Sequence, residues 1–139
     1  FEGHEENMLD WIAPYSQTDT LESTLRGFLG RMLFSGDDVY KPVRVLSGGE
    51  KVRLMLARMM LFGSNVLVVD QPTNHLDLES ITAVNNGVRD FKGTVLFASH
   101  DHEFVQTIAT RIIEIRETGV LDKECTYDEF LEFRETYKG

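Results

Sequence analysis

The sequence has little that could fix a fold covalently: it contains one cysteine, Cys125, in 139 residues, and only three prolines. One thiol cannot form an internal disulfide, so an apolar core must hold the fold, and a hydrophobic content of 42% can supply one. No apolar run is long enough to cross a bilayer, and no charged-then-apolar segment of the signal-peptide type occurs. We therefore expect a reducing, cytoplasmic setting without membrane partners.

Positive charge is scarce as well, because 14 Lys and Arg face 23 Asp and Glu, which gives a formal net charge of −9. Sequence-independent wrapping of nucleic acid needs concentrated positive charge, so we exclude that function for the chain as a whole, although not a local basic patch. The first residue is Phe1 rather than Met, so we expect a piece of a longer chain or a processed product.

Residues 1–62 are predicted to be mainly helical. The segment MLDWIAPY suits a short helix that ends at Pro14, and Asp19 and Glu22 have the spacing of a capping box. A helix of about four turns is expected behind this box, with one stripe of apolar residues that faces the core. The stripe consists of Leu21, Leu25, Phe28, Leu29 and Met32.

The stretch LSGGEKVRLMLARMMLFG predicts a further helix that begins at two glycines. Ser47 and Glu50 have capping-box spacing, and Gly63 suits the C-terminal cap. Glycines at a helix N-terminus let a phosphate approach free N–H groups, but capped helices after glycine turns are common, so this feature alone is weak. The predicted buried stripe consists of Val52, Met55, Leu56, Met59 and Met60.

Two apolar segments of strand length follow, residues 65–70 and 94–99, and their continuous apolar character is typical of strands covered on both faces. Between them, Asp77 is expected to cap a helix. This strand-helix-strand unit predicts an α/β fold with a parallel sheet. The inner stripe of the helix is predicted to be Leu78, Ile81, Val84, Val88 and Phe91.

The remaining sequence predicts a helix at HEFVQTIA, a third strand at RIIEI, a short strand in ETGVLD and a last helix capped by Thr126 and Glu129. The last helix is expected to use Phe130, Phe133 and Tyr137 for packing.

Polar side chains end both strands of the parallel pair, at the edge where open α/β sheets bind ligands. Asp70 and Gln71 follow the first strand, and Ser99 and His100 follow the second. A carboxylate such as Asp70 suits Mg²⁺, which keeps several waters and uses few carboxylates beside substrate phosphates. The HDHE run at 100–103 does not predict a zinc site, because adjacent residues diverge and no cysteine or third spaced histidine completes it.

Taken together, these segments resemble an ABC-type ATPase in order and spacing. LSGGE resembles the signature motif, VLVVDQPTNHLD the Walker B strand with its D-loop, and SHD the switch histidine. PTNHLD is similar to the ABC-F branch, cytoplasmic twin-ATPase proteins without membrane domains, many of which act on the ribosome. The resemblance covers essentially the whole chain and implies the C-terminal part of the second ATPase domain.

The resemblance implies that Ser47, Gly48 and Gly49 contact the γ-phosphate of an ATP held by a partner ATPase domain. Glu50, in the same motif, is assigned to this nucleotide site as well. Ribosome or tRNA contacts are expected through regions outside this segment.

By the same resemblance, Asp70 would hold Mg²⁺ through water, Asp77 would end the D-loop at the dimer interface, and His100 would contact the γ-phosphate. Gln71 stands where the family has the glutamate that polarises the attacking water. An amide can still hydrogen-bond to water but cannot take up a proton, so we expect ATP binding, closure and very slow hydrolysis. A substitution made to trap the closed state and a naturally degenerate site both remain open.

One part of the family pattern is missing, because no G-x-x-x-x-G-K-[ST] loop occurs and the family's glutamine loop is absent too. Both lie upstream in the family. We therefore expect a partial P-loop NTPase fold, with a helical signature subdomain at residues 1–62 and the C-terminal half of the ATPase core at 63–139. Alone, this segment should bind nucleotide poorly.

Two other functions stay open beside an ABC-F ATPase that regulates a ribosomal partner. One is the ATPase subunit of a membrane transporter, against which PTNHLD argues. The other is a non-catalytic, nucleotide-gated interaction module in which Gln71 is natural.

Overall fold

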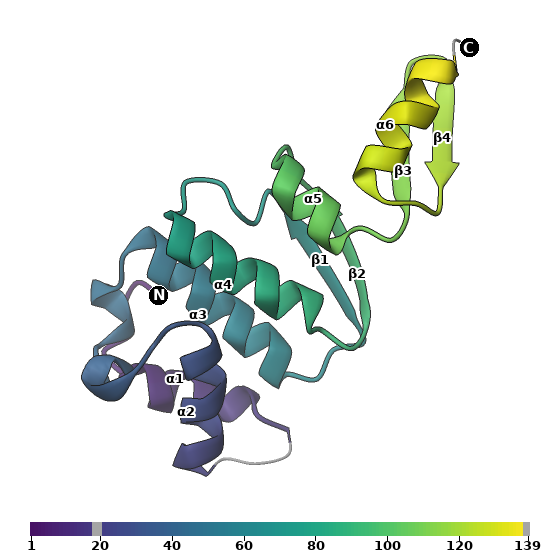
Figure 1. Ribbon diagram of the computed structural model, residues 1–139. Coiled ribbons are helices and arrows are strands. Elements are labelled where there is room, and N and C mark those ends of the chain that lie inside the picture. The colour runs from purple at the N-terminus through teal and green to yellow at the C-terminus, as the bar shows by residue number, and fades with distance from the viewer. Residues whose placement is uncertain (18–20, 138–139) are drawn as a thin grey trace. The chain divides into compact units, whose positions relative to one another are not determined.

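The computed structural model describes residues 1–17 and 21–137. They form two compact units, Phe1–Ala98 and Ser99–Gly139, and each is described by itself (Figure 1). Asp19 and its predicted capping box lie outside the described residues. The expected boundary between residues 62 and 63 stays a prediction.

The helical part of the first unit precedes its strands, as predicted. Its α-helices and 3₁₀ helices are α1 (Met8–Ile12), η1 (Ala13–Tyr15), α2 (Glu22–Arg31), η2 (Gly36–Tyr40), η3 (Val43–Val45) and α3 (Gly48–Leu61). Helix α1 ends just before Pro14, which lies in the first turn of η1. The core of this part contains the fully buried side chains of Met8, Ile12, Leu29, Met32 and Val43.

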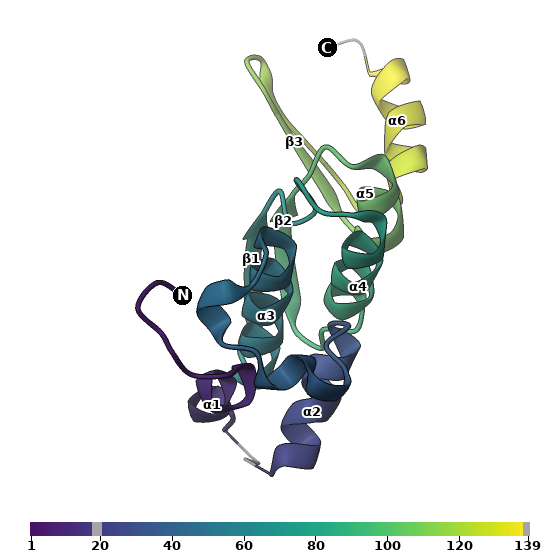
Figure 2. The same cartoon turned by 90° about the vertical axis from the view of Figure 1, so that its left-hand side faces the viewer.

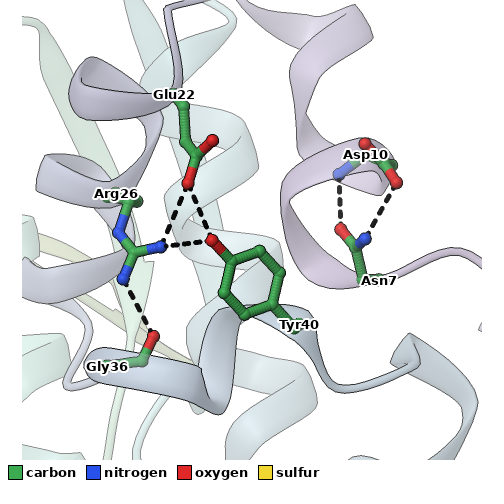
Figure 3. Close-up of polar contacts among 6 residues, drawn as sticks. All are labelled: Asn7, Asp10, Glu22, Arg26, Gly36 and Tyr40. Atoms are coloured by element: carbon green, nitrogen blue, oxygen red, sulfur yellow. Dashed lines mark hydrogen bonds and ion pairs between the residues drawn. The ribbon is translucent and has the colours of Figure 1, made fainter.

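Helix α2 is shorter than predicted, with 10 residues or about three turns. Leu21 lies at its N-cap and is 65% exposed, so its place in the predicted stripe is wrong, whereas Leu25 and Leu29 are buried. Arg26 ties α2 to η2, because its guanidinium donates to Glu22, the Tyr40 hydroxyl and the Gly36 carbonyl (Figure 3). These groups are exposed, so the network orients η2 more than it stabilises the fold.

Helix α3 begins with the predicted capping box. Ser47 Oγ accepts from the Glu50 N–H at 3.2 Å, and the Glu50 carboxylate accepts from the Ser47 N–H at 2.7 Å. The predicted stripe is confirmed only in part. Leu56 is buried and the three methionines are half-buried, but Val52 is exposed, and Leu54, Ala57 and Leu61 are buried outside the stripe. The segment is apolar on several sides, and α3 packs on both α2 and α4, so neighbours rather than periodicity decide which side is buried.

Strands β1 (Val66–Asp70) and β2 (Thr94–Ala98) pair in parallel, in register from Val66 opposite Thr94 to Asp70 opposite Ala98. Helix α4 (Leu78–Arg89) connects them and confirms the predicted strand-helix-strand unit. Helices α3 and α4 lie on the same side of the strand pair (Figures 1 and 2).

The prediction that both strand faces are covered is wrong for the described residues. Leu67 is buried, but Val66, Val68 and Leu96 are exposed, because no described element of this unit covers that face. The stripe of α4 also differs from the prediction. Leu78 is 83% exposed in the first turn, whereas Val84 and Val88 are buried.

The second unit contains α5 (His102–Ile108), β3 (Ile112–Arg116), β4 (Gly119–Lys123) and α6 (Tyr127–Thr136). The predicted third strand forms an antiparallel hairpin with β4. The capping box of Thr126 and Glu129 is confirmed, and Phe130 is buried while Tyr137 is exposed. Within residues 1–17 and 21–137, every helix is too short or too polar to span a membrane.

Gly93 sits where the chain enters β2, and its substitution tests the fold. A Cβ at this position would overlap the Asn65 carbonyl, which accepts the Thr94 N–H at 2.9 Å. Because that neighbour is backbone, we expect Gly93→Ala to lower the free energy of unfolding by about 2 kcal/mol. Gly30→Ala is the control, because a Cβ there meets nothing within 4 Å in α2, and it should stabilise by about 0.5–1 kcal/mol. Urea unfolding of the intact protein measures both changes, and equal effects would contradict this packing.

The cap of α4 predicts a pH effect. Asp77 accepts from the Ser80 N–H at 2.8 Å, and hydrogen bonds from Ser80, first from its side chain, lower the pKa of Asp77. A lowered pKa stabilises the fold above the ordinary value of about 3.9, and this contribution is lost as pH falls through the folded-state pKa.

Asn caps as well as Asp but does not titrate. We therefore expect Asp77→Asn to be close to the parent in thermal midpoint at pH 7 and to lose less of it in acid. Thermal melts of both proteins between pH 7 and about pH 2 test this. The additional decrease in the thermal midpoint of the parent should occur below the ordinary pKa of an aspartate. An identical decline in the two proteins would be the contrary result.

Candidate functional site

The turn that follows β1 has an unusual backbone. Gln71 has φ 49° and His75 has φ 62°, which is the left-handed region that non-glycine residues rarely adopt. The Gln71 N–H donates to the Ala98 carbonyl at 2.8 Å, and the Gln71 carbonyl accepts from the Asn74 N–H at 3.2 Å. Such strain persists only when surrounding contacts hold it, and it clusters at functional sites. The turn is therefore a candidate for function on geometry as well as sequence.

The start of α3 offers two backbone donors. The capping box uses the N–H groups of Ser47 and Glu50, whereas those of Gly48 and Gly49 have no hydrogen bond to any described residue. A Cβ on Gly48 would meet nothing within 4 Å, so the backbone there is open. Together with the helix dipole, these donors suit an anion such as a phosphate.

Gly49, unlike Gly48, packs against another segment of the chain. A Cβ on Gly49 would lie 3.5 Å from a Leu76 methyl and 3.6 Å from the Ser80 hydroxyl, so Gly49 packs against the turn and the start of α4. This contact brings the predicted signature residues beside the turn that begins with Gln71 and ends with Asp77. The sequence predicted both segments but not their packing.

Lys41 is a neighbour of the site that the sequence did not reveal. Its ammonium lies 2.7 Å from the Asp38 carboxylate and 3.9 Å from the Glu50 carboxylate. Asp38, and more weakly Glu50, raise the pKa of Lys41 above its ordinary value. Its positive charge offsets the negative charge of Glu50, which would otherwise repel an anion at the helix start. Asp38 is three residues from Lys41, but no short-range sequence signal connects Lys41 with Glu50.

Asp70 is the last residue of β1, and its side chain is exposed. Among the described residues, no group of three or more His, Cys, Asp or Glu side chains could hold a metal ion. A cation at Asp70 would therefore depend on water and on ligand oxygens, which is the pattern that Mg²⁺ adopts beside phosphates. This single carboxylate fits a magnesium–nucleotide complex better than a protein-only metal cage.

His100 belongs to the second unit, between β2 and α5. Beside it, Ser99 Oγ accepts from the Asp101 N–H at 3.0 Å, and Asp101 caps α5 by accepting from the Phe104 N–H. The local structure is thus a capped helix start, and the predicted phosphate contact of His100 stays a prediction.

Comparison with known proteins gives the family. Residues 4–74 match the family model described as ABC transporter. The chain is 63% identical over 138 residues to the uncharacterized ABC transporter ATP-binding protein YkpA of Bacillus subtilis (strain 168), which covers 99% of this chain and 26% of that protein. It is 42% identical over 108 residues to ABC transporter F family member 2 of Arabidopsis thaliana, and the match covers 78% of this chain and 16% of that protein.

A further relative is the energy-dependent translational throttle protein EttA of Escherichia coli (strain K12). The identity is 38% over 119 residues, which is 85% of this chain and 21% of EttA. The chain thus spans about a quarter or less of the length of these relatives.

Solved structures support the fold. The archaeal ribosome recycling factor aABCE1, in a complex with ribosomal stalk protein aP1, has a TM-score of 0.72 at 21% identity over 94% of this chain and 28% of that one. An inward-facing putative metal-chelate type ABC transporter has a TM-score of 0.66 at 16% identity, and the match covers 97% of this chain and 61% of that one. The predicted P-loop NTPase core is confirmed, and this chain belongs to the ABC ATPase family, with ABC-F proteins among its relatives.

Proposed function

We propose that this chain supplies one side of an ATP site in a protein with paired ATPase domains and that ATP draws the pair together. The observation that carries the proposal is the open start of α3. Gly48 and Gly49 leave their N–H groups without a described partner there, and Gly49 packs against Leu76 in the turn that begins at Gln71. Family membership supports ATP as the anion, because the family is defined by its ATP-binding cassette.

The residues present fit a nucleotide with Mg²⁺. The N–H groups of Gly48 and Gly49, with the Ser47 hydroxyl, would hold the terminal phosphate of an ATP bound by the partner domain. His100 would contact a γ-phosphate. Asp70 would hold Mg²⁺ through water. When bound, Mg²⁺ offsets the negative charge of the phosphates. The N-terminal positive end of α3 acts in the same direction.

Gln71 sets the rate in this proposal. Its amide can orient a water molecule, but it has no basic oxygen that takes up the proton released during attack. The left-handed backbone of Gln71, bonded to Ala98, would hold the amide at the place of the family's glutamate. The site would therefore bind ATP, close and hydrolyse slowly, and the segment alone would be inactive.

We also propose that the intact protein acts in the cytoplasm on translation. EttA is named a translational throttle, and the structural neighbour aABCE1 is a ribosome recycling factor in a complex with a ribosomal stalk protein. The net charge of −9 does not suit direct binding to RNA, so the ribosome would be contacted through regions outside this segment.

Gln71 also supports a second candidate, a nucleotide-gated interaction module that closes on ATP without needing hydrolysis. In that case Gln71 is the natural residue, and closure alone is the output. The two candidates share the binding site and differ only in turnover.

The test is Gln71→Glu in the intact protein. A carboxylate restores the proton acceptor, so we expect phosphate release to rise by about 10²-fold or more, within the range of general-base catalysis. Gln17→Glu is the matched control, because it adds the same charge at an exposed position of the same unit, and it should leave the rate unchanged. Phosphate release under saturating ATP and Mg²⁺ measures both. If Gln71→Glu releases phosphate no faster than Gln17→Glu, Gln71 is not at the catalytic position.

A further inference from the structure

The face of α3 that meets α4 contains an arginine among small and apolar residues. Gly49 contacts Leu76 and Ser80, while Leu56 and Met60 each lie 3.6 Å from the position of a Cβ on Gly87 of α4. Residues 49, 53, 56 and 60 are spaced by four, three and four, so they share one side of the helix. Arg53 therefore lies in the α3–α4 seam, one turn after the glycine that touches the site.

The guanidinium of Arg53 binds the end of α2. Its Nη1 donates to the Met32 carbonyl at 2.7 Å, and its carbon lies 4.8 Å from the centre of the Phe34 ring. A positive charge stabilises carbonyls at a helix C-terminus. The Met32 side chain in turn reaches the Cα of Gly87, where it occupies the space of a Cβ. Arg53 thus fixes the position of Met32, whose side chain packs against α4.

The other side of Arg53 is not satisfied. Its Nε is buried without a hydrogen-bond partner among the described residues. Its charge also contributes, as a minor cause, to the lowered pKa of Asp77 at the start of α4. By contact, the arginine is connected to α2 and, through the Met32 side chain, to Gly87 of α4.

An arginine is a poor choice for this seam on stability grounds alone. Burying part of a guanidinium and leaving one N–H unpaired is unfavourable, and apolar replacements for buried charged residues are often neutral or stabilising. A role in fixing one arrangement of α3, α4 and the turn accounts for the residue better than stability does.

We propose that Arg53 is a positioning residue for the nucleotide site, which keeps α4 and the turn 71–77 packed on α3 by holding Met32 in the α3–α4 seam. The inference rests on the proposed function. Arg53 acts through Met32 and the helix packing, so its loss displaces groups that act on ATP without removing any of them. Displacements of about 1 Å at a catalytic site can cost 10²-fold in rate.

The experiment uses the intact protein with Gln71→Glu, in which turnover is expected to be fast enough to resolve. Arg53→Met removes the charge and keeps a flexible apolar side chain, and Arg53→Lys keeps the charge without the planar guanidinium. Arg31→Met is the matched control, because Arg31 also lies over a ring, Phe28 at 5.0 Å, but is exposed on α2.

We expect Arg53→Met to lower kcat about 10-fold, with KM for ATP within about two-fold and an unchanged thermal midpoint. Arg53→Lys should fall between the parent and the Met variant, and Arg31→Met should match the parent. Combination with Met32→Leu should cost less than the product of the two single effects, since Arg53 acts through Met32.

Three results would overturn the inference. They are a kcat of Arg53→Met equal to that of Arg31→Met, independent effects of Arg53→Met and Met32→Leu, and a rate loss that only follows the loss of folded protein. If Arg53→Met does not fold, Arg53→Lys decides, because a lower kcat at unchanged thermal midpoint supports the role and an unchanged kcat refutes it. Absence of turnover in the Gln71→Glu parent is a separate result, which refutes the proposed function.

Discussion

Close packing of α3 on α4 is the constraint on which the first unit depends. A glycine lies at each end of the seam: Gly49 against Leu76 and Ser80, and Gly87 against Met32, Leu56 and Met60. A Cβ on Gly87 would overlap the Met32 methyl, whereas one on Gly49 would make an ordinary contact, and through Gly49 the turn after β1 sits beside the start of α3. The candidate site therefore follows from helix packing, and its polar groups are placed by apolar contacts.

The start of α3 divides its hydrogen-bonding capacity between structure and ligand. The capping box satisfies the N–H groups at its first and last positions and leaves those of Gly48 and Gly49 available. An acidic residue in the first turn stabilises the helix but repels an anion, and Lys41 beside Glu50 reduces that repulsion. A stable helix and an anion site can thus share the same terminus.

The sequence predicted best what short-range chemistry decides. The capping boxes at Ser47 and Thr126, the cap at Asp77 and the parallel strand pair were all correct, because each depends on residues a few positions apart or on strand composition. The buried stripe of α3 was correct at Leu56 but wrong at Val52, since in a helix that is apolar on several sides the neighbouring elements decide which side is buried. The role of Arg53 was not predictable, because its partner Met32 is distant in sequence, and no short-range pattern connects Lys41 with Glu50.

The backbone at Gln71 decides whether an amide side chain changes the geometry of the turn. The left-handed φ and the bond to Ala98 are properties of the main chain, so a glutamate and a glutamine can occupy this position with the same geometry. The amide therefore does not release the strain of the turn, and a site built this way keeps its shape when it loses its base. Slow turnover at this site would then arise from missing proton transfer, with the positions of the surrounding groups retained. Under the proposed function, binding and closure would then be separable from hydrolysis, since α3 would act in the first and the side chain at position 71 in the second.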